Sequence, residues 1–169
     1  EAAVTAAVDA LGGLDILANV AGIFRPGHTL EQEISVFDTT ISVNLAGTFY
    51  MCRSALPGLL DGGGSIINIA SAAAIQGVPY NAAYCASKAG IVGLTRSLAS
   101  EYARRGVRVN CVCPGGVMTP MIEAGFPVDG IDAAVLARMA PQMNRIGEPE
   151  DIAALIAYLA SDEAAYMTG

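Results

Sequence analysis

Three short apolar segments, separated by long helical patterns, constrain the fold of this chain most. They lie near residues 14–20, 65–70 and 107–113, and Gly, Pro or Ser bounds each of them. Their apolar residues are nearly continuous instead of alternating with polar ones, which is typical of parallel strands that are covered on both faces. We therefore predict a parallel β-sheet buried between layers of helices.

The connections between these segments have helical periodicity. Helical spacing of apolar residues starts at Val4 and recurs over about 30–60, 81–105 and 149–160. We expect one or two helices over 30–60 with acidic residues in the first turn after Thr29, and a long helix over 81–105 closed by Gly106. Pro149 fits the first turn of the last helix. Alternating strands and helices of these lengths predict right-handed crossovers in a doubly wound, Rossmann-like α/β domain.

The chain is long enough for one domain, which we place at residues 1–169. Residues 121–147 are irregular and interrupted by Pro and Gly. Long excursions between regular elements are often binding loops or lids. We therefore expect 119–146 to form a substrate lid.

Composition excludes several classes of function. Hydrophobic residues make up 53% of the chain, but no apolar run reaches the roughly 18 residues of a membrane helix. A net charge of −7 without a basic stripe argues against a nucleic-acid partner. The four cysteines have no metal-ligand spacing, so we expect no metal site and reduced thiols of a cytoplasmic protein. We expect His28, the single histidine, to be a solvated loop residue.

Small residues follow all three predicted strands, at the sheet edge where open α/β sheets bind ligands. Asn19, Ala21 and Gly22 follow the first, Ser71 follows the second, and Pro114 to Thr119 follow the third. A single such group is usually a tight turn. Three at one edge favour the close approach of a flat ligand to the backbone.

Tyr84 and Lys88 are four residues apart on a predicted helix, and therefore share one face. A phenol has a pKa of about 10, and a nearby ammonium favours its ionised form. Ser71 could hold a carbonyl oxygen while the phenol of Tyr84 protonates it. We expect Lys88 to lower the pKa of Tyr84 in a site that interconverts a carbonyl and an alcohol; the alternative is an ordinary surface pair.

Six stretches in sequence order resemble the short-chain dehydrogenase/reductase family. They are NVAG (19–22), SVNLAGTF (42–49), GSIINIAS (64–71), YCASK (84–88), RVNCVCPGGVMT (108–119) and RIGEPEDIA (145–153). Together they cover nearly the whole chain. Val20 departs from the family pattern, which more often has a second Asn there.

The resemblance implies a role for each matching residue. Tyr84 would be the general acid/base, and Lys88 would lower its pKa and bind the nicotinamide ribose. Ser71 would orient the substrate carbonyl. Asn44 would sit at a helix kink and hold a water of a proton relay; otherwise it is an ordinary polar helix residue. The residues implied in NAD or NADP binding are Asn19, Ala21, Gly22, Tyr84, Lys88, Pro114, Gly115, Val117 and Thr119.

The family's glycine-rich phosphate-binding turn, TGxxxGxG, does not occur in these 169 residues. We therefore expect a partial copy of the fold, without its first strands and its last strand, from a longer reductase of roughly 250 residues. The first strand described here would otherwise be an exposed sheet edge. Without that turn we expect no tight binding of the cofactor, and NAD cannot be told from NADP.

The resemblance implies an NAD(P)-dependent oxidoreductase that interconverts a ketone and a secondary alcohol by hydride transfer. Apolar residues around the predicted pocket favour a hydrophobic substrate, such as a 3-oxoacyl thioester, a steroid or a small cyclic alcohol; they are Ile75, Val78, Met118, Met121, Ile122 and Phe126. The alternatives are a non-catalytic or cofactor-incompetent protein of the same fold and, less favoured, a nucleotide-sugar epimerase or dehydratase. A homodimer or homotetramer through the helices over 36–60 and 81–105 is expected, with Gly90 and Gly93 allowing close helix approach.

Overall fold

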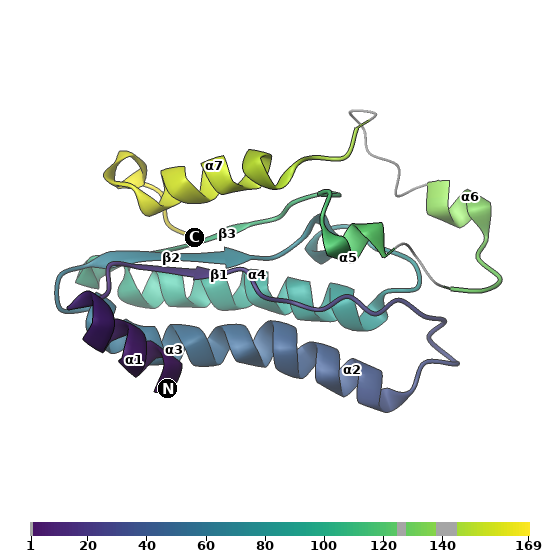
Figure 1. Cartoon of the computed structure of the whole chain (residues 1–169), viewed down its shortest axis with the longest axis horizontal. Coiled ribbons are helices and arrows are strands. Elements are labelled where there is room, and N and C mark those ends of the chain that lie inside the picture. Colours follow the sequence, from purple (N-terminus) through teal and green to yellow (C-terminus); the bar gives the residue numbers. More distant parts are fainter. Residues whose placement is uncertain (1, 125–127, 138–144) are drawn as a thin grey trace.

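The computed structural model describes residues 2–124, 128–137 and 145–169. Its centre is a parallel sheet in the order β1-β2-β3, with β1 at Ile16–Asn19, β2 at Gly64–Ile69 and β3 at Val107–Val112. All three predicted strands therefore form, and the parallel α/β fold is confirmed. Because the strands are parallel, their carboxyl ends meet at one edge of the sheet (Figure 1).

Helices cover the sheet in two layers (Figure 1). On one face lie α1 (Ala2–Leu11), α3 (Gly47–Leu59) and α4 (Ala82–Tyr102), and on the other lies α7 (Pro149–Ala160). The remaining helices are α2 (Ile34–Ile41), α5 (Pro120–Glu123) and α6 (Ala133–Leu136), with short helical turns at η1 (Ser42–Ala46), η2 (Ala72–Ala74), η3 (Ala103–Arg105) and η5 (Asp162–Ala164). None of the helices in the described ranges is both long and apolar enough to cross a membrane.

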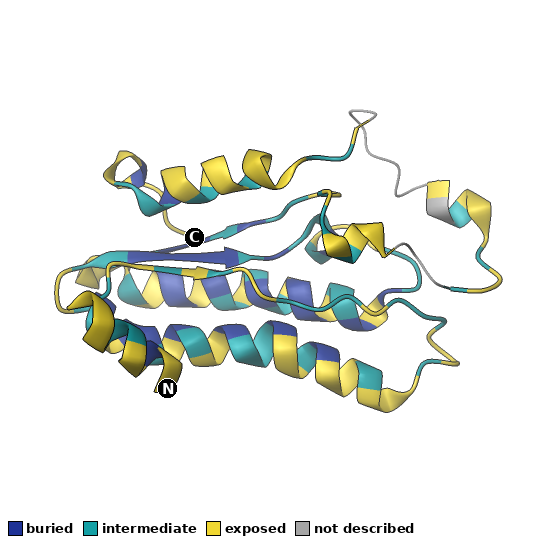
Figure 2. Cartoon of the chain, in the orientation of Figure 1, coloured by how far each residue is buried: buried dark blue, intermediate teal, exposed yellow. Residues whose placement is uncertain are grey.

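The two faces of the sheet have separate cores because side chains alternate along a strand. Ile66 packs with Leu59, Leu98 and other residues of α1, α3 and α4, whereas its neighbour Ile67 packs with Leu159 of α7. The central strand β2 is buried over most of its length (Figure 2). This arrangement fixes the carboxyl edge on which the candidate site is built.

Strand β1 differs from the prediction that every strand is covered on both faces. Its burial alternates between exposed and half-buried residues, and Ile16 and Val20 are 47% and 58% exposed. Helix α7 packs on β2 instead, and the face of β1 that carries Ile16 stays about half exposed. β1 is an exposed edge strand among the described residues, as the resemblance to a partial fold implied.

The helix predicted over 30–60 starts later than expected. Glu31 and Glu33 precede it, and α2 has no acidic residue in its first turn. The reason is a turn in which the amides of Glu31 and Gln32 both donate to the carbonyl of His28, at 3.0 and 2.9 Å. The helix then runs from Ile34 to Leu59, interrupted by the π-helical turn η1.

The other helix ends follow the sequence. Gly106 closes the turn after α4 with a left-handed φ of 80°, where glycine is favoured. Pro149 occupies the first turn of α7, which Glu148 and Asp151 cap reciprocally. Gly90 allows close packing within the chain, because a Cβ there would lie 2.6 Å from Leu45 Cδ2.

The predicted lid over 119–146 is described only in part. Helices α5 and α6 lie beyond the carboxyl edge of the sheet (Figure 1). Residues 125–127 and 138–144, and with them Phe126 of the predicted pocket, lie outside the described residues.

Candidate active site

The ends of β2 and β3 are joined where the candidate site begins. The amide of Ala70 donates to the carbonyl of Val112 at 2.8 Å, and the amide of Ala72 donates to Pro114 at 2.7 Å. Ser71 lies between these two links. Its hydroxyl also accepts a hydrogen bond from the amide of Ala73 at 3.1 Å, which starts the turn η2. Ser71 therefore caps a turn and also faces the site.

Tyr84 lies in the first turn of α4, as predicted. Its ring contacts the edge of Phe24, with 5.1 Å between ring centroids. Burial raises the pKa of the Tyr84 phenol, and a hydrogen bond with the side chain of Ser71 partly offsets that rise. The structure thus brings Ser71 and Tyr84 together, 13 residues apart in sequence, at the carboxyl edge of the sheet.

Lys88 is almost fully buried, with 3% of its surface exposed. Its ammonium donates to the carbonyl of Ile69 at 2.7 Å and lies 5.7 Å from the centre of the Tyr84 ring. Burial lowers the pKa of Lys88 to about 8, because water no longer stabilises its charge. Burial of the phenol dominates and raises the pKa of Tyr84 in this structure, and the expected lowering by Lys88 stays a prediction.

Asn44 connects the segment after β1 to α4. Its Oδ1 accepts from the amide of Ile23 at 2.8 Å, and its Nδ2 donates to the carbonyl of Ile23 at 3.0 Å and to Ser87 Oγ at 3.1 Å. The residue is fully buried within the π-helical turn η1, so the expected helix irregularity is present. The partners Ile23 and Ser87 were missed, because no local sequence signal links them to Asn44.

Gly22 lies closer to Asn44 and Lys88 than the sequence suggested. A Cβ on Gly22 would be 3.2 Å from Asn44 Oδ1 and 3.5 Å from Lys88 Nζ. The resemblance assigned Gly22 to the adenosine half of a cofactor. In the structure it lies beside the side chain of Asn44 and the ammonium of Lys88, so its small size matters there.

Asn19 uses its side chain inside the sheet. Its Nδ2 donates to Asn68 Oδ1 at 2.9 Å and to Cys52 Sγ at 3.3 Å, and Asn68 in turn donates to Thr95 Oγ1 at 3.0 Å. This polar network ties β1, β2 and α4 together. Ala21, by contrast, is exposed. Of these two residues implied in cofactor binding, only Ala21 presents an exposed side chain at this edge.

The segment after β3 is held by a second chain segment. The amide of Met118 donates to Gly147 at 2.8 Å, and the amide of Gly147 donates to Gly116 at 2.9 Å. Thr119 Oγ1 donates to the carbonyl of Val117 at 3.2 Å. Nothing lies within 4 Å of a Cβ built on Gly115. The backbone from Pro114 to Thr119 is therefore fixed and leaves open space beside it.

Two features fit a nicotinamide cofactor. The Lys88 ammonium can donate three hydrogen bonds but makes one within the described part of the chain, to Ile69. The open backbone at Gly115 follows β3 at the same edge. Lys88, Pro114, Gly115, Val117 and Thr119 could thus hold the nicotinamide half.

His28 was expected to be a solvated loop residue, but it makes contacts with distant segments. His28 is half-buried, and its Nε2 lies 2.8 Å from the carbonyl of Asp129, 101 residues away. Its ring contacts the edge of the Tyr80 ring, with 4.9 Å between centroids. His28 is therefore not a simple solvated loop residue. The sequence separation explains why no local pattern revealed these contacts.

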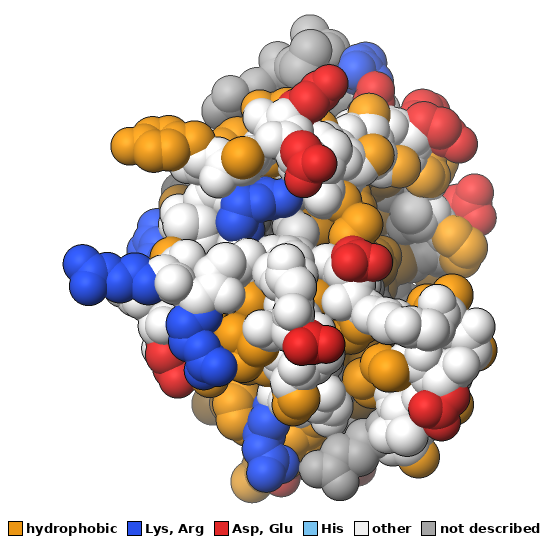
Figure 3. Space-filling view, turned by 90° about the vertical axis from the view of Figure 1, so that its left-hand side faces the viewer, with side chains coloured by type: hydrophobic (Ala, Val, Ile, Leu, Met, Phe, Trp, Pro, Cys, Tyr) orange, Lys and Arg blue, Asp and Glu red, His pale blue; other side chains and the backbone are white. Residues whose placement is uncertain are grey.

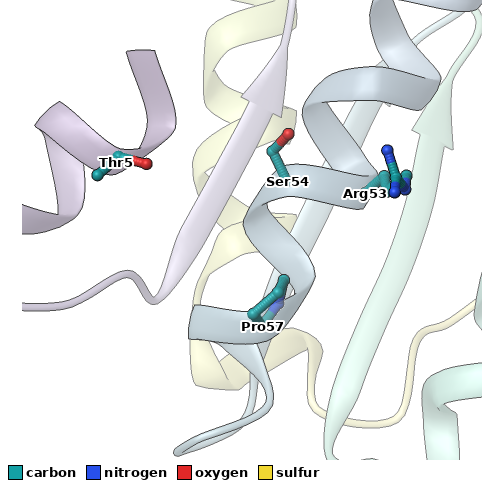
Figure 4. A pocket seen from close by; sticks show the side chains of 4 residues that line it. All are labelled: Thr5, Arg53, Ser54 and Pro57. Carbon is teal, nitrogen blue, oxygen red and sulfur yellow. The ribbon is translucent and has the colours of Figure 1, made fainter. Parts of the chain in front are cut away.

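A pocket of about 310 Å³ lies elsewhere, between α1 and α3 (Figure 4). Thr5, Arg53, Ser54 and Pro57 line it. It belongs to the end of the molecule where the strands begin, which Figure 3 shows as a mixture of charged, polar and hydrophobic side chains. The catalytic candidates are at the opposite end of the sheet, so this pocket is not part of the site.

Comparison with known proteins agrees with this geometry. The family model described as enoyl-(acyl carrier protein) reductase matches residues 1–169. The chain is 39% identical to 2-keto-3-deoxy-L-fuconate dehydrogenase of Xanthomonas campestris pv. campestris, over 99% of this chain and 58% of that protein. It is 44% identical to 3beta-hydroxysteroid dehydrogenase 1 of Eggerthella lenta, over 97% of this chain and 63% of that protein.

A solved structure from Sinorhizobium meliloti 1021, described as a short-chain alcohol dehydrogenase, superposes with a TM-score of 0.87 and 38% identity. The match covers 98% of this chain and 66% of that one. The chain thus spans 58% of the length of the Xanthomonas relative and about two thirds of this solved structure. By the family model, the relatives and the shared fold, the chain belongs to the short-chain dehydrogenase/reductase family.

Proposed function

We propose that this chain carries the catalytic part of an NAD(P)-dependent oxidoreductase that interconverts a ketone and a secondary alcohol. The observation that carries the proposal is the group formed by Ser71, Tyr84 and Lys88. The side chain of Ser71 lies close enough to the Tyr84 phenol at the carboxyl edge of the sheet to lower its pKa, and the buried ammonium of Lys88 lies beside the Tyr84 ring.

In the direction of reduction, the residues act on the substrate's carbonyl oxygen. Ser71 donates a hydrogen bond that orients it, and Tyr84 delivers the proton as the carbonyl carbon is reduced. The bound nicotinamide would supply the hydride in this direction and accept it in the other. Burial raises the pKa of Tyr84, so the phenol holds its proton at neutral pH and is ready to act as the acid.

Lys88 and Asn44 do not contact the substrate carbonyl; Lys88 binds the cofactor and Asn44 holds the surrounding segments in place. Lys88 has hydrogen-bonding capacity left for the ribose hydroxyls of the cofactor. Asn44 fixes the segment after β1 against α4 through Ile23 and Ser87. Its part in a water relay stays a prediction. NAD and NADP both remain candidate cofactors.

For the substrate, we propose a hydrophobic ketone or alcohol. Three apolar side chains of the predicted pocket are exposed at this end of the molecule: Ile75 at 76%, Met118 at 38% and Ile122 at 37%. A relative acts on a hydroxysteroid, which is of this class. Another relative is a dehydrogenase of a sugar acid, so the family tie alone does not choose the substrate. The segment 119–146 would act as the lid.

For the assembly, we propose a cytoplasmic homodimer or homotetramer. Apolar side chains stand out along α2, η1 and α3, namely Ile34, Phe37, Val43, Phe49 and Tyr50, which are 40–78% exposed. Such a surface suits burial against a second copy. The four free cysteines fit a reducing compartment. Multi-angle light scattering would test the assembly, and a monomer would contradict it.

Titration of the intact protein with NADH and NADPH, followed by nicotinamide fluorescence, separates the main proposal from a cofactor-incompetent protein of the same fold. Saturable binding of one nucleotide supports the enzyme and identifies the cofactor. Tyr84→Phe should then lower kcat by about 100-fold to 10,000-fold with nucleotide binding retained. Tyr158→Phe, on exposed α7, is the matched control and should leave kcat unchanged. Absence of binding, or full activity of Tyr84→Phe, would overturn the proposal.

A further inference from the structure

Three chain segments that are distant in sequence meet beside the candidate site. They are the loop after β1 at His28, the entrance to α4 at Tyr80, and the turn 129–132 that leads into α6. All three lie at the carboxyl edge of the sheet. The turn belongs to the excursion after β3, and Tyr80 is only four residues before Tyr84.

Both ends of the turn 129–132 are hydrogen-bonded to this ring pair. His28 Nε2 lies 2.8 Å from the carbonyl of Asp129, and because a carbonyl can only accept, Nε2 must carry a proton. The amide of Asp132 donates to the hydroxyl of Tyr80 at 3.2 Å. Asp132 also caps α6 by accepting from the amide of Ala134 at 2.8 Å. The ring pair therefore fixes the start of α6.

The backbone of Tyr80 supports a special role. Its φ of 62° lies in the left-handed region, and it is the one non-glycine residue in the described ranges with positive φ. A bulky residue in that region is strained and has to be held by its surroundings. Here the carbonyl of Tyr80 accepts from the amide of Gly27 at 2.8 Å, and its ring lies against His28. With this backbone conformation the hydroxyl of Tyr80 reaches the turn, where it accepts from the amide of Asp132.

We propose that His28 and Tyr80 are positioning residues that anchor the turn 129–132, and through it α6, beside the carboxyl edge where substrate would enter the site. This inference rests on the proposed function. It adds that substrate affinity depends on a pair which does not itself take part in proton transfer. The pair connects the first segment of the site, the entrance to the catalytic helix and the substrate segment.

The anchoring is tested without any activity, by amide hydrogen exchange of residues 128–134 in the intact protein. Tyr80→Phe keeps the ring and removes the acceptor for the Asp132 amide. His28→Phe keeps a ring against Tyr80 and removes the donor to Asp129. Each variant should speed exchange of this segment about threefold to tenfold. His28→Gln, which retains an N–H donor, should restore slow exchange.

Leu30→Ala is the matched control, because this side chain in the same loop is fully exposed. In Leu30→Ala the amide hydrogens of residues 128–134 should exchange at the same rates as in the wild type. Unchanged exchange in both Tyr80→Phe and His28→Phe would overturn the anchoring, whatever the outcome of the cofactor titration.

Steady-state kinetics then test the link to substrate. Both variants should raise KM for the carbonyl substrate about threefold to tenfold, with kcat within about twofold of the wild type and KM for the nucleotide unchanged. Because both residues hold the same turn, the double variant should raise KM for the carbonyl substrate by less than the product of the two single increases. A fall in kcat like that of Tyr84→Phe, or an unchanged substrate KM, would contradict the positioning role.

Discussion

The ammonium of Lys88 lies 5.7 Å from the centre of the Tyr84 ring, while it donates its hydrogen bond to the backbone of Ile69. The two residues therefore share a helix face, but burial governs each of them. Burial lowers the pKa of Lys88 and raises that of Tyr84. Both changes favour the neutral side chains, because burial penalises the charged forms.

Lys88 should make stability depend on pH. Its pKa falls from 10.5 to about 8 on folding, so below pH 8 both states carry the charge and burial penalises the folded one. Between pH 8 and 10.5 the folded state releases the proton first, and stability rises with pH. Lys88→Met has no group that titrates at this position, so its stability should not show this rise with pH. Urea unfolding at pH 7 and pH 10 should show the wild type gaining about 2 to 3 kcal/mol relative to Lys88→Met. Parallel pH profiles would contradict a charged, desolvated lysine.

Gly22→Ala should impair the site with little effect on the fold. The new Cβ would lie 3.2 Å from Asn44 Oδ1, so the Asn44 side chain has to move by a few tenths of an ångström, whereas Lys88 Nζ at 3.5 Å is at ordinary contact distance. We expect kcat/KM to fall roughly tenfold, because small displacements of catalytic groups are costly. Gly13→Ala, where a Cβ meets nothing within 4 Å, is the control. Equal activities of the two variants would show that the contact at Gly22 is unimportant.

Asn44→Ala should destabilise the protein. It leaves the amide and the carbonyl of Ile23 without the partners that Asn44 now supplies, in a buried turn. Each buried polar group left unpaired costs about 1 to 3 kcal/mol, so we expect a loss of about 2 to 4 kcal/mol in the free energy of unfolding. Chemical denaturation measures it. A loss below about 0.5 kcal/mol would mean that water replaces the side chain.

Gly64→Ala, at the start of β2, and Gly62→Ala, in the turn before it, form a matched pair. A Cβ at Gly64 would lie 2.6 Å from the carbonyl oxygen of Asp15 and from Leu59 Cδ2, and at Gly62 it would meet nothing within 4 Å. The backbone oxygen of Asp15 already accepts from the amide of Ser65 at 2.9 Å, so it cannot easily move away. Thermal unfolding should show a loss of about 1 to 3 kcal/mol for Gly64→Ala and almost none for Gly62→Ala. Equal melting temperatures would rule out the close approach of β1 and β2 at this point.

The sequence alone determined the elements and much of the site. The continuous apolar segments predicted three parallel strands, because a strand buried on both faces needs apolar residues throughout. The spacing of Tyr84 and Lys88 predicted a shared helix face, since α-helix geometry fixes the relation of residues four apart. These are local properties, so local patterns are enough to find them.

Only the tertiary structure decided how those residues are held and charged. Asn44 meets Ile23, and His28 meets Asp129, across 21 and 101 residues, and no periodicity relates such positions. Gly90 of α4 packs against Leu45 of η1, a pairing that no local pattern reveals. The pKa of Tyr84 rises instead of falling, because burial depends on every segment that surrounds the phenol. Contacts between distant segments, and the removal of water that they cause, exist only once the chain has folded.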